Sequence, residues 1–272
     1  MLTREDLLKE YQELAPYPAV LLRLSEIVLS GTYTIDDIVN VIKYDQGITV
    51  DVIRYSNSVE SSSSRSIASL QDAIVRMGGS RILRYLLARW FYSSVSSALK
   101  ADRQSKAFWQ HGVISALASE VLSEEFPKLS HQDAFTTALL HDIGMIPLSM
   151  HAMKMSLDFD WSVFADDLDT ELKLFGYSHA ETGAMLLEYW GFPLDMVDAV
   201  RFHSLGEGGP SPLSDLVRMS SYFAAQTALD VEMREKTFQG FGVDIDKTTF
   251  QRIITKLESQ SFLLFDELKA MD

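Results

Sequence analysis

The chain has 272 residues, of which 47% are hydrophobic, and its formal net charge is −14. This hydrophobic content is enough for a buried core and excludes a disordered or fibrous chain. The sequence contains no cysteine, which excludes a disulfide scaffold, a zinc–thiolate site and thiol catalysis, and which fits a reducing compartment. The acidic balance argues against general binding to nucleic acid, because phosphate contacts need clusters of basic side chains.

The N-terminal segment MLTREDLLKEYQEL contains acidic residues and lacks the apolar region of a signal peptide. No apolar run approaches the ~20 residues that a helix needs to cross a bilayer. We therefore expect a cytoplasmic protein without a membrane partner.

Helix signals recur along the whole chain. Four hydroxyl residues are each followed three positions later by an acidic residue, which is the pattern of a helix N-cap; these pairs are Thr3/Asp6, Thr34/Asp37, Ser69/Asp72 and Ser178/Glu181. Pro18 suits the first turn of a helix that Gly31 ends. Apolar residues at helical spacing predict further helices over 80–99, 104–126, 131–153, 161–175, 178–190, 193–204, 212–228 and 247–270. No stretch alternates as a hairpin strand would, so we predict an all-α bundle of about ten to thirteen helices.

Three segments predict irregular structure: the serine-rich stretch 56–66, the segment 206–212, and the surroundings of Gly240. We expect an N-terminal helical lobe over 1–103 and a second helical lobe over 104–272 that carries the histidines. These are two lobes of one body in the simplest interpretation.

Charge is unevenly distributed. From Arg54 to Lys106 there are nine Lys or Arg and three acids, a local charge of +6, so the rest of the chain carries −20. Solvated helix faces explain such a run most simply. The alternative is a contact surface for an acidic protein partner, with Arg76, Arg81, Arg84 and Arg89 as its candidate residues.

The adjacent residues His141 and Asp142 are the strongest candidates for chemistry. Neighbours on a helix lie about 100° apart, so both side chains can reach one ion in a cleft. Imidazole and carboxylate together suit Fe, Mn, Zn and similar divalent metals. A carboxylate so close to the apolar run that ends at Leu140 is also costly to bury without a partner. A buried His–Asp hydrogen-bond pair, or an N-cap, remains the alternative.

Three other histidines accompany this pair on predicted helices. His111 lies early in a long helix beside aromatic residues, His179 opens a helix, and His203 lies near a helix end. The positive end of the helix dipole favours a neutral, ligand-competent ring at His179. Each histidine alone is commonly a core or surface residue, but the set suggests one site. We assign no role to His131 or His151.

The segment Leu-Leu-His-Asp-Ile-Gly at 139–144, with His111 upstream, resembles the HD superfamily of metal-dependent phosphohydrolases. Further segments are similar to HDOD proteins, a bacterial signalling branch of that fold, and the resemblance covers about residues 10–228. These segments are 14–20, 42–45 with 52–58, 69–78, 175–183 and 190–193. Gln46 stands where the family usually has proline.

The resemblance implies that His111, His141 and Asp142 hold a metal. It also implies a distal aspartate where this chain has Ser221, and Met145 replaces the lysine of the related HD-GYP phosphodiesterases. His179 and His203 match the additional histidines of those enzymes, whose downstream Gly-Tyr-Pro signature is absent. The implied cofactor is a divalent metal (Fe, Mn, Ni, Zn or Mg).

Three functional hypotheses follow. The first is a non-catalytic signalling protein with a degenerate metal site that binds a small nucleotide-like ligand or a protein partner. The second is a metal-dependent phosphohydrolase acting on a nucleotide or another phosphoester. The third is an interaction module that uses its basic 54–106 surface. Glycine-rich phosphate loops, dinucleotide fingerprints and serine-hydrolase elbows are absent from the sequence.

Overall fold

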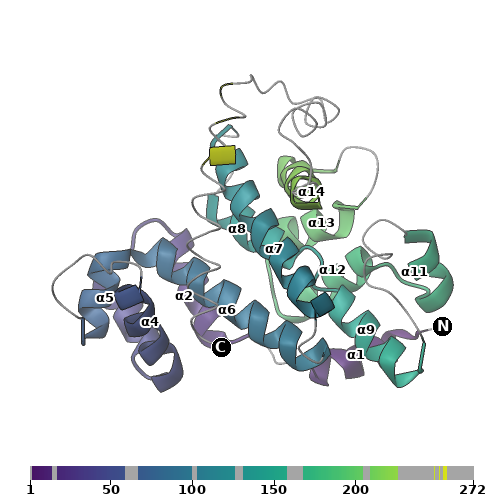
Figure 1. Cartoon of the computed structure of the whole chain (residues 1–272), viewed down its shortest axis with the longest axis horizontal. Helices are drawn as coiled ribbons and strands as arrows, with labels where there is room; N and C mark the ends of the chain where they lie inside the picture. Colours follow the sequence, from purple (N-terminus) through teal and green to yellow (C-terminus); the bar gives the residue numbers. More distant parts are fainter. Residues whose placement is uncertain are drawn as a thin grey trace. The chain divides into compact units, whose positions relative to one another are not determined.

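The computed structural model describes residues 2–13, 17–58, 67–99, 103–125, 131–157, 168–204 and 209–225, together with residues 248, 251, 254 and 255. These residues form helices, turns and short connections and no strand, which confirms the predicted all-α class (Figure 1). None of the described helices combines the length and the apolar character of a bilayer-spanning segment.

The chain divides into two units, the first made of 1–16 and 91–257, the second of 17–90 and 258–272. The described helices of the second unit are α2 (Ala19–Leu29), α3 (Ile35–Ile42), α4 (Gln46–Ser58) and α5 (Leu70–Met77). Helix α6 (Gly79–Leu99) contains the boundary. The first unit has α1 (Arg4–Glu13), α7 (Arg103–Leu122), the 3-10 turn η1 (Ser123–Glu125), α8 (His131–Leu140), α9 (Met145–Lys154), α11 (Leu168–Phe175), α12 (His179–Tyr189), α13 (Leu194–Phe202) and α14 (Pro212–Ala225).

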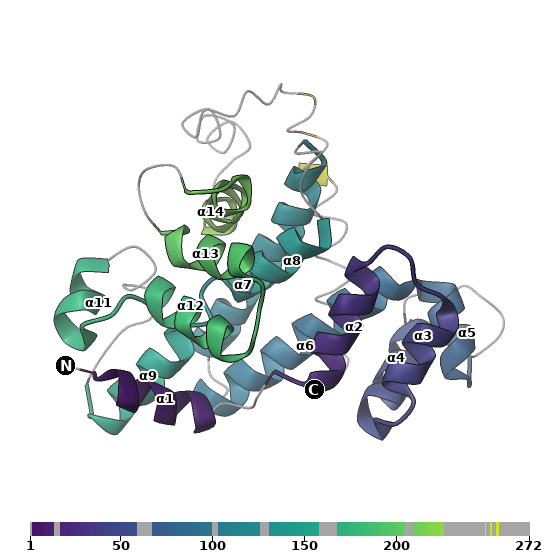
Figure 2. The ribbon, with the colours of Figure 1, turned by 180° about the vertical axis from the view of Figure 1, so that it is seen from behind.

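The limits of the two units differ from the lobes 1–103 and 104–272 expected from the sequence. One reason is that α1, at the start of the chain, packs within the first unit. Helix α1 lies beside α9 (Figure 2). The Tyr11 hydroxyl donates to the carbonyl of Thr182 at 2.8 Å. The buried Glu10 pairs with Lys154 at 2.8 Å. Long-range contacts of this kind are invisible to local sequence patterns.

Local capping interactions explain where the helices α3, α4 and α5 of the second unit begin. Thr34 and Asp37 form the predicted capping box, and Ser69 accepts from the amide of Asp72 as predicted. Asp45 accepts from the amide of Ile48 at 2.9 Å, so it caps α4. Gln46 is therefore the first residue of a helix, a position that also tolerates proline.

The arginines of the candidate partner surface are half-buried. Arg89 forms an ion pair with Asp51 at 2.6 Å, and Arg76 donates to the carbonyl of Ser56 at 3.4 Å. Ser56 itself is buried in α4, so the serine-rich stretch is helical at its start, contrary to prediction; residues 59–66 lie outside the described residues. Arg76 and Arg89 thus make contacts inside their own unit.

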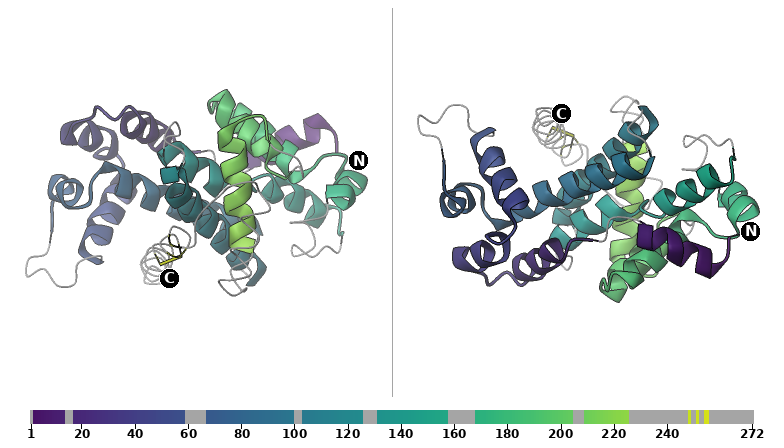
Figure 3. Two further views of the ribbon diagram at one scale, coloured as in Figure 1. Left: turned by 90° about the horizontal axis from the view of Figure 1, so that it is seen from above. Right: turned by 90° about the horizontal axis from the view of Figure 1, so that it is seen from below.

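The first unit is built on α7, which packs along its length against α8 and α14. Figure 3 shows α14, in yellow-green, crossing the teal helices α7 and α8. The contact surfaces are apolar and fully buried: Val113 and Ala116 on α7, Phe135 on α8, and Leu216 and Val217 on α14. Burial of apolar area of this kind is the main driving force for such packing.

The prediction of one helix over 131–153 is wrong. The structure has α8 up to Leu140, a turn over 141–144, and then α9. Pro147 supplies the physical reason, because proline lacks the amide hydrogen of an interior helical residue and its ring clashes with the carbonyl four residues earlier. In the structure Pro147 occupies the first turn of α9, where no such bond is needed. His141 and Asp142 therefore lie in a turn.

The other predicted helices are found with small shifts of their ends, apart from 161–175, which is described only from residue 168, and 247–270, of which only four residues are described. Pro18 is the N-cap residue of α2 and not its first helical residue. Within 206–212, Gly209 to Ser211 are irregular and Pro212 begins α14. The surroundings of Gly240 lie outside the described residues.

Candidate metal centre

His111 projects from the middle of α7 towards α8 and α14. The next residue, Gly112, lies so close to α8 that an added Cβ would be 3.2 Å from the carbonyl oxygen of Leu139 and 2.7 Å from the ring of Phe91. A larger residue at 112 would force α7 away from α8. The Nε2 atom of His111 lies 3.3 Å from the hydroxyl of Ser221 on α14.

His141 and Asp142 form the start of the turn between α8 and α9. Gly144 closes this turn against the first turn of α12, where an added Cβ would overlap the carbonyl oxygen of His179 and the amide nitrogen of Gly183. The absence of a side chain at Gly144 therefore lets the turn approach the helix that carries His179. This close backbone contact explains why the segment Leu-Leu-His-Asp-Ile-Gly ends in a glycine.

His179 is the first residue of α12, whose N-cap Ser178 forms the predicted capping box with Glu181. Its Nδ1 atom lies 2.7 Å and 2.9 Å from the two carboxylate oxygens of Glu171, and its backbone amide donates to the same carboxylate at 2.7 Å. Glu171 on α11 is fully buried. Sequence reasoning missed this residue.

His203 follows the last residue of α13, as predicted for a histidine near a helix end. Its Nδ1 atom lies 2.6 Å from the carbonyl oxygen of Val200. Its Nε2 atom lies 3.2 Å from Asp142 Oδ1 and 3.3 Å from the Nε2 atom of His179. The Ser204 hydroxyl lies 3.0 Å from both of these Nε2 atoms, a second polar neighbour that sequence reasoning did not identify.

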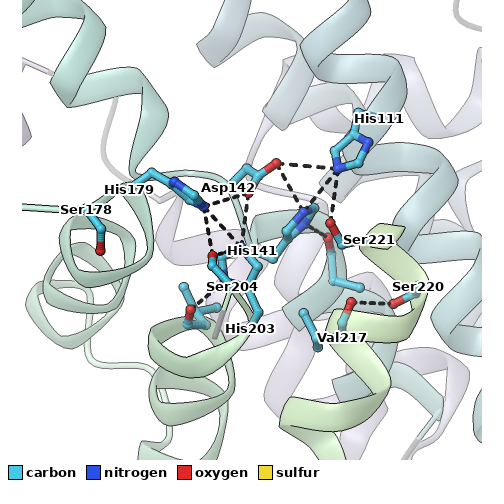
Figure 4. A network of polar contacts seen from close by, with 12 residues as sticks. His111, His141, Asp142, Ser178, His179, His203, Ser204, Val217, Ser220 and Ser221 are labelled. Atoms are coloured by element: carbon cyan, nitrogen blue, oxygen red, sulfur yellow. Dashed lines mark hydrogen bonds and ion pairs between the residues drawn. The ribbon is translucent and has the colours of Figure 1, made fainter. Parts of the chain in front are cut away.

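The structure brings the five predicted residues together around one carboxylate (Figure 4). Asp142 Oδ2 faces the Nε2 atoms of His141, at 3.1 Å, and His111, at 3.5 Å. Asp142 Oδ1 faces those of His203, at 3.2 Å, and His179, at 3.5 Å. Two triads of potential metal ligands therefore share Asp142. We call the triad of His111, His141 and Asp142 the outer triad, and that of His179, His203 and Asp142 the inner triad.

The names outer and inner refer to the solvent exposure of the histidine side chains in each triad. The side chain of His111 is 21% exposed, whereas those of His179 and His203 are 2% and 4% exposed. The outer triad therefore contains the one cluster histidine that solvent reaches to an appreciable degree.

Protonation is disfavoured at two of the rings. Burial lowers the pKa of His111 to about 4, against the opposing effect of Asp142, and burial likewise lowers the pKa of His203 to about 4. Burial alone would raise the pKa of Asp142, but His141, His203 and His179 hold it well below its usual value. At neutral pH the centre therefore holds the Asp142 carboxylate together with two imidazoles, those of His111 and His203, that resist protonation.

The donor set fits a cation. A carbonyl or carboxylate can only accept a hydrogen bond from a ring nitrogen, so the contacts at Nδ1 fix the Nδ1–H tautomer of neutral His141, His179 and His203. Their Nε2 lone pairs then converge on Asp142. Lone pairs and a carboxylate at 3.1–3.5 Å repel one another unless a positive charge lies among them. This arrangement suits a divalent metal, with imidazole-rich sites favouring Fe, Ni or Zn over Mg.

Other sequence candidates lie apart from this cluster. His151 lies 3.8 Å from Glu10, next to α1, and His131 has no described side chain. Met145 is buried at the start of α9.

Comparison with known proteins gives the family. The HDOD domain model matches residues 14–205. The chain belongs to the HDOD domain family. This HDOD chain is 22% identical over 201 residues to an uncharacterized protein of Treponema pallidum, covering 68% of the chain and 36% of that protein. It therefore spans about a third of the length of that curated relative.

Solved structures share the HDOD fold. A putative phosphohydrolase from Shewanella amazonensis has a TM-score of 0.71 at 22% identity, with 97% of this chain and 98% of that chain covered. A putative signal transduction protein from Marinobacter aquaeolei has a TM-score of 0.65 at 18% identity, with 96% and 65% covered. At these identities the likeness concerns the fold.

Proposed function

We propose that this HDOD protein is a regulatory module that binds a divalent metal at the His–Asp cluster and an anionic, phosphate-bearing ligand beside it, without hydrolysing that ligand. The convergence of four histidine Nε2 atoms on the Asp142 carboxylate carries the proposal. A divalent ion bound there would act as a Lewis acid towards an oxygen of the ligand. The partial exposure of His111 supports binding of the ligand on the side of the outer triad.

The absence of turnover is inferred from two substitutions relative to catalytic HD proteins. Ser221 offers a neutral hydroxyl, 3.3 Å from His111 Nε2, where the family resemblance implies a carboxylate. The thioether of the buried Met145 replaces the lysine of HD-GYP enzymes and has no charge to hold a phosphate. The outer triad thus lacks a second carboxylate ligand beside Asp142, and position 145 lacks a cation, both of which would support hydrolysis.

A regulatory role is supported by family membership and by the Marinobacter structure, whose name assigns it to signal transduction. In that role the chain would relay ligand binding to a protein partner in the cytoplasm. The basic surface of the second unit is one proposed docking site, with Arg81 and Arg84 as the residues to reverse in a binding test.

Metal-dependent phosphohydrolysis is the second candidate function. It is favoured by the sharing of Asp142 between two triads, because two adjacent metal ions can stabilise both the attacking and the leaving oxygen of a phosphoester. The Shewanella structure carries the name of a putative phosphohydrolase.

Calorimetry and a turnover assay on the same preparation separate the two functions. Protein loaded with Mn, Fe, Ni, Zn or Mg is titrated with phosphate, mononucleotides and cyclic dinucleotides, and each compound is then assayed for product. We expect metal-dependent binding without product, and its loss in His141→Ala. Product formation that disappears in His141→Ala would instead establish the phosphohydrolase.

A further inference from the structure

Glu171 is a fully buried carboxylate that belongs to neither triad. It lies on α11, next in sequence to the exposed Leu172, and contacts the first residue of α12. Burial of a carboxylate costs several kcal/mol or more unless it is fully hydrogen-bonded. Its position therefore needs an explanation in terms of its partners.

Glu171 contacts His179 through both of its carboxylate oxygens. Oε1 lies 2.7 Å and Oε2 2.9 Å from the ring Nδ1, and Oε2 also accepts from the backbone amide of His179 at 2.7 Å. The carboxylate thus fixes both the ring and the first backbone amide of α12. The ring cannot rotate about its Cβ–Cγ bond without losing this pair of contacts, so Nε2 stays directed at Asp142 and His203.

The corresponding nitrogens of His141 and His203 contact neutral carbonyl oxygens instead, of Ala138 at 2.7 Å and Val200 at 2.6 Å. A charged acceptor at Nδ1–H raises the basicity of the opposite nitrogen more than a carbonyl does, and so strengthens it as a metal ligand. Glu171 also adds a second negative charge beside that of Asp142, which matches the charge of one divalent ion.

We propose that Glu171 is a positioning residue that makes the inner triad the tighter of the two metal sites. The inference rests on the proposed function, since it presupposes that the cluster binds metal. The inference adds an order in which the two sites bind metal. The inner triad binds metal first and retains it. The outer triad, with Ser221 and the partly exposed His111, exchanges its metal and ligands with solvent.

The test is a titration of the full-length, metal-free protein with Zn²⁺ against a competing chelator, repeated with Co²⁺, whose visible absorbance reports imidazole ligation. Glu171→Gln keeps the size of the side chain and removes its charge. Glu181→Gln is the matched control, because Glu181 lies in the first turn of α12 with His179 and its carboxylate accepts from the backbone amide of Ser178. Thermal unfolding without metal shows whether each variant is folded.

We expect Glu171→Gln to weaken the tighter class of Zn²⁺ binding by roughly 10- to 100-fold, and Glu181→Gln to leave it unchanged. Metal binding by the wild type that Glu171→Gln leaves intact would overturn this inference alone, whereas a wild type that binds no metal would also overturn the proposed function.

Nitrogen NMR of the wild-type imidazoles keeps the inference testable if Glu171→Gln does not fold. The inference requires the metal-free His179 ring to carry its proton on Nδ1. A proton on Nε2 of neutral His179 would contradict it.

Discussion

His203 Nε2 lies 3.2 Å from Asp142 Oδ1, although 61 residues separate the two in the chain. The contact of His203 Nδ1 with the Val200 carbonyl leaves the neutral ring with a lone pair, and not a hydrogen, facing the carboxylate. Such a pair is stabilised only by a proton or by a metal ion. Burial makes the proton unfavourable, and this competition gives the first prediction.

The metal-free protein should lose stability as the pH falls from about 6.5 to about 4. The pKa values of His111 and His203 are lowered to about 4 in the folded protein, against 6.5 as the ordinary value. In that interval the unfolded chain binds more protons, so acid favours unfolding, and the stability is complete only above pH 6.5. Each pKa unit corresponds to about 1.4 kcal/mol, and solvent screening reduces this contribution at His111, which is partly exposed.

Urea unfolding at a series of pH values, in the presence of a chelator, checks this prediction. The slope between pH 6.5 and pH 4 should decrease in His203→Gln, which lacks one of the two groups. A free energy of unfolding that stays constant over this interval in the wild type would contradict the burial argument.

Ser221→Asp should tighten metal binding at the outer triad. The new carboxylate would lie beside His111 Nε2, which is 3.3 Å from the present hydroxyl, and would supply an anionic ligand in place of a neutral one. We expect an increase of roughly tenfold or more in affinity for the weaker class of metal sites.

Tyr222→Asp is the control for that experiment, because it adds the same charge at the adjacent, 40% exposed position of α14. An equal gain in both variants would show that the effect is only a general electrostatic one. If Ser221→Asp also produced phosphoester turnover, the missing carboxylate would be identified as the reason for the lack of hydrolysis in the wild type.

Gly144→Ala should destabilise the first unit and weaken metal binding together. The added Cβ would overlap backbone atoms of His179 and Gly183, which cannot yield as a flexible side chain can. Overpacking of this kind costs about 1–3 kcal/mol, and its relief would move the turn with Asp142 away from His179.

Gly191→Ala provides a comparison, since Gly191 has open space around its Cβ position and a positive φ of 80°. It should lower stability through backbone strain while leaving the metal affinity unchanged. A normal metal affinity in folded Gly144→Ala would show that the turn and α12 are not coupled as the structure indicates.

Tyr11→Phe should lower the free energy of unfolding by about 1–2 kcal/mol, because the buried carbonyl of Thr182 loses its donor while the ring is retained. Equilibrium unfolding of the full chain measures this loss. Tyr44→Phe, at a position 81% exposed, should have no effect. Equal stabilities of wild type and Tyr11→Phe would mean that α1 is not anchored through this bond.

The parts of the structure that the sequence predicts well are local. The capping pairs at Thr34 and Ser178 form as expected, because an N-cap and its partner lie within one turn. The five candidate residues named from the sequence also lie close together in the structure.

The structural features that the sequence did not predict depend on contacts between segments that are distant in the chain. The break after Leu140 had a local signal in Pro147, but apolar periodicity on both sides concealed it. Glu171 had none, because its partner lies on another helix and an acidic residue on an amphipathic helix is normally solvated. The sharing of Asp142 between two triads likewise depends on how four separate segments pack.

Elemental analysis of the protein, purified without a metal-binding tag or chelator, tests the central claim most directly. Asp142→Asn removes the carboxylate that both triads share, and Asp198→Asn removes a surface carboxylate on α13. We predict near-stoichiometric Fe, Ni, Zn or Mn in the wild type and in Asp198→Asn, and its loss in Asp142→Asn. A wild type that is free of metal, and that takes up none on reconstitution, would contradict the metal centre.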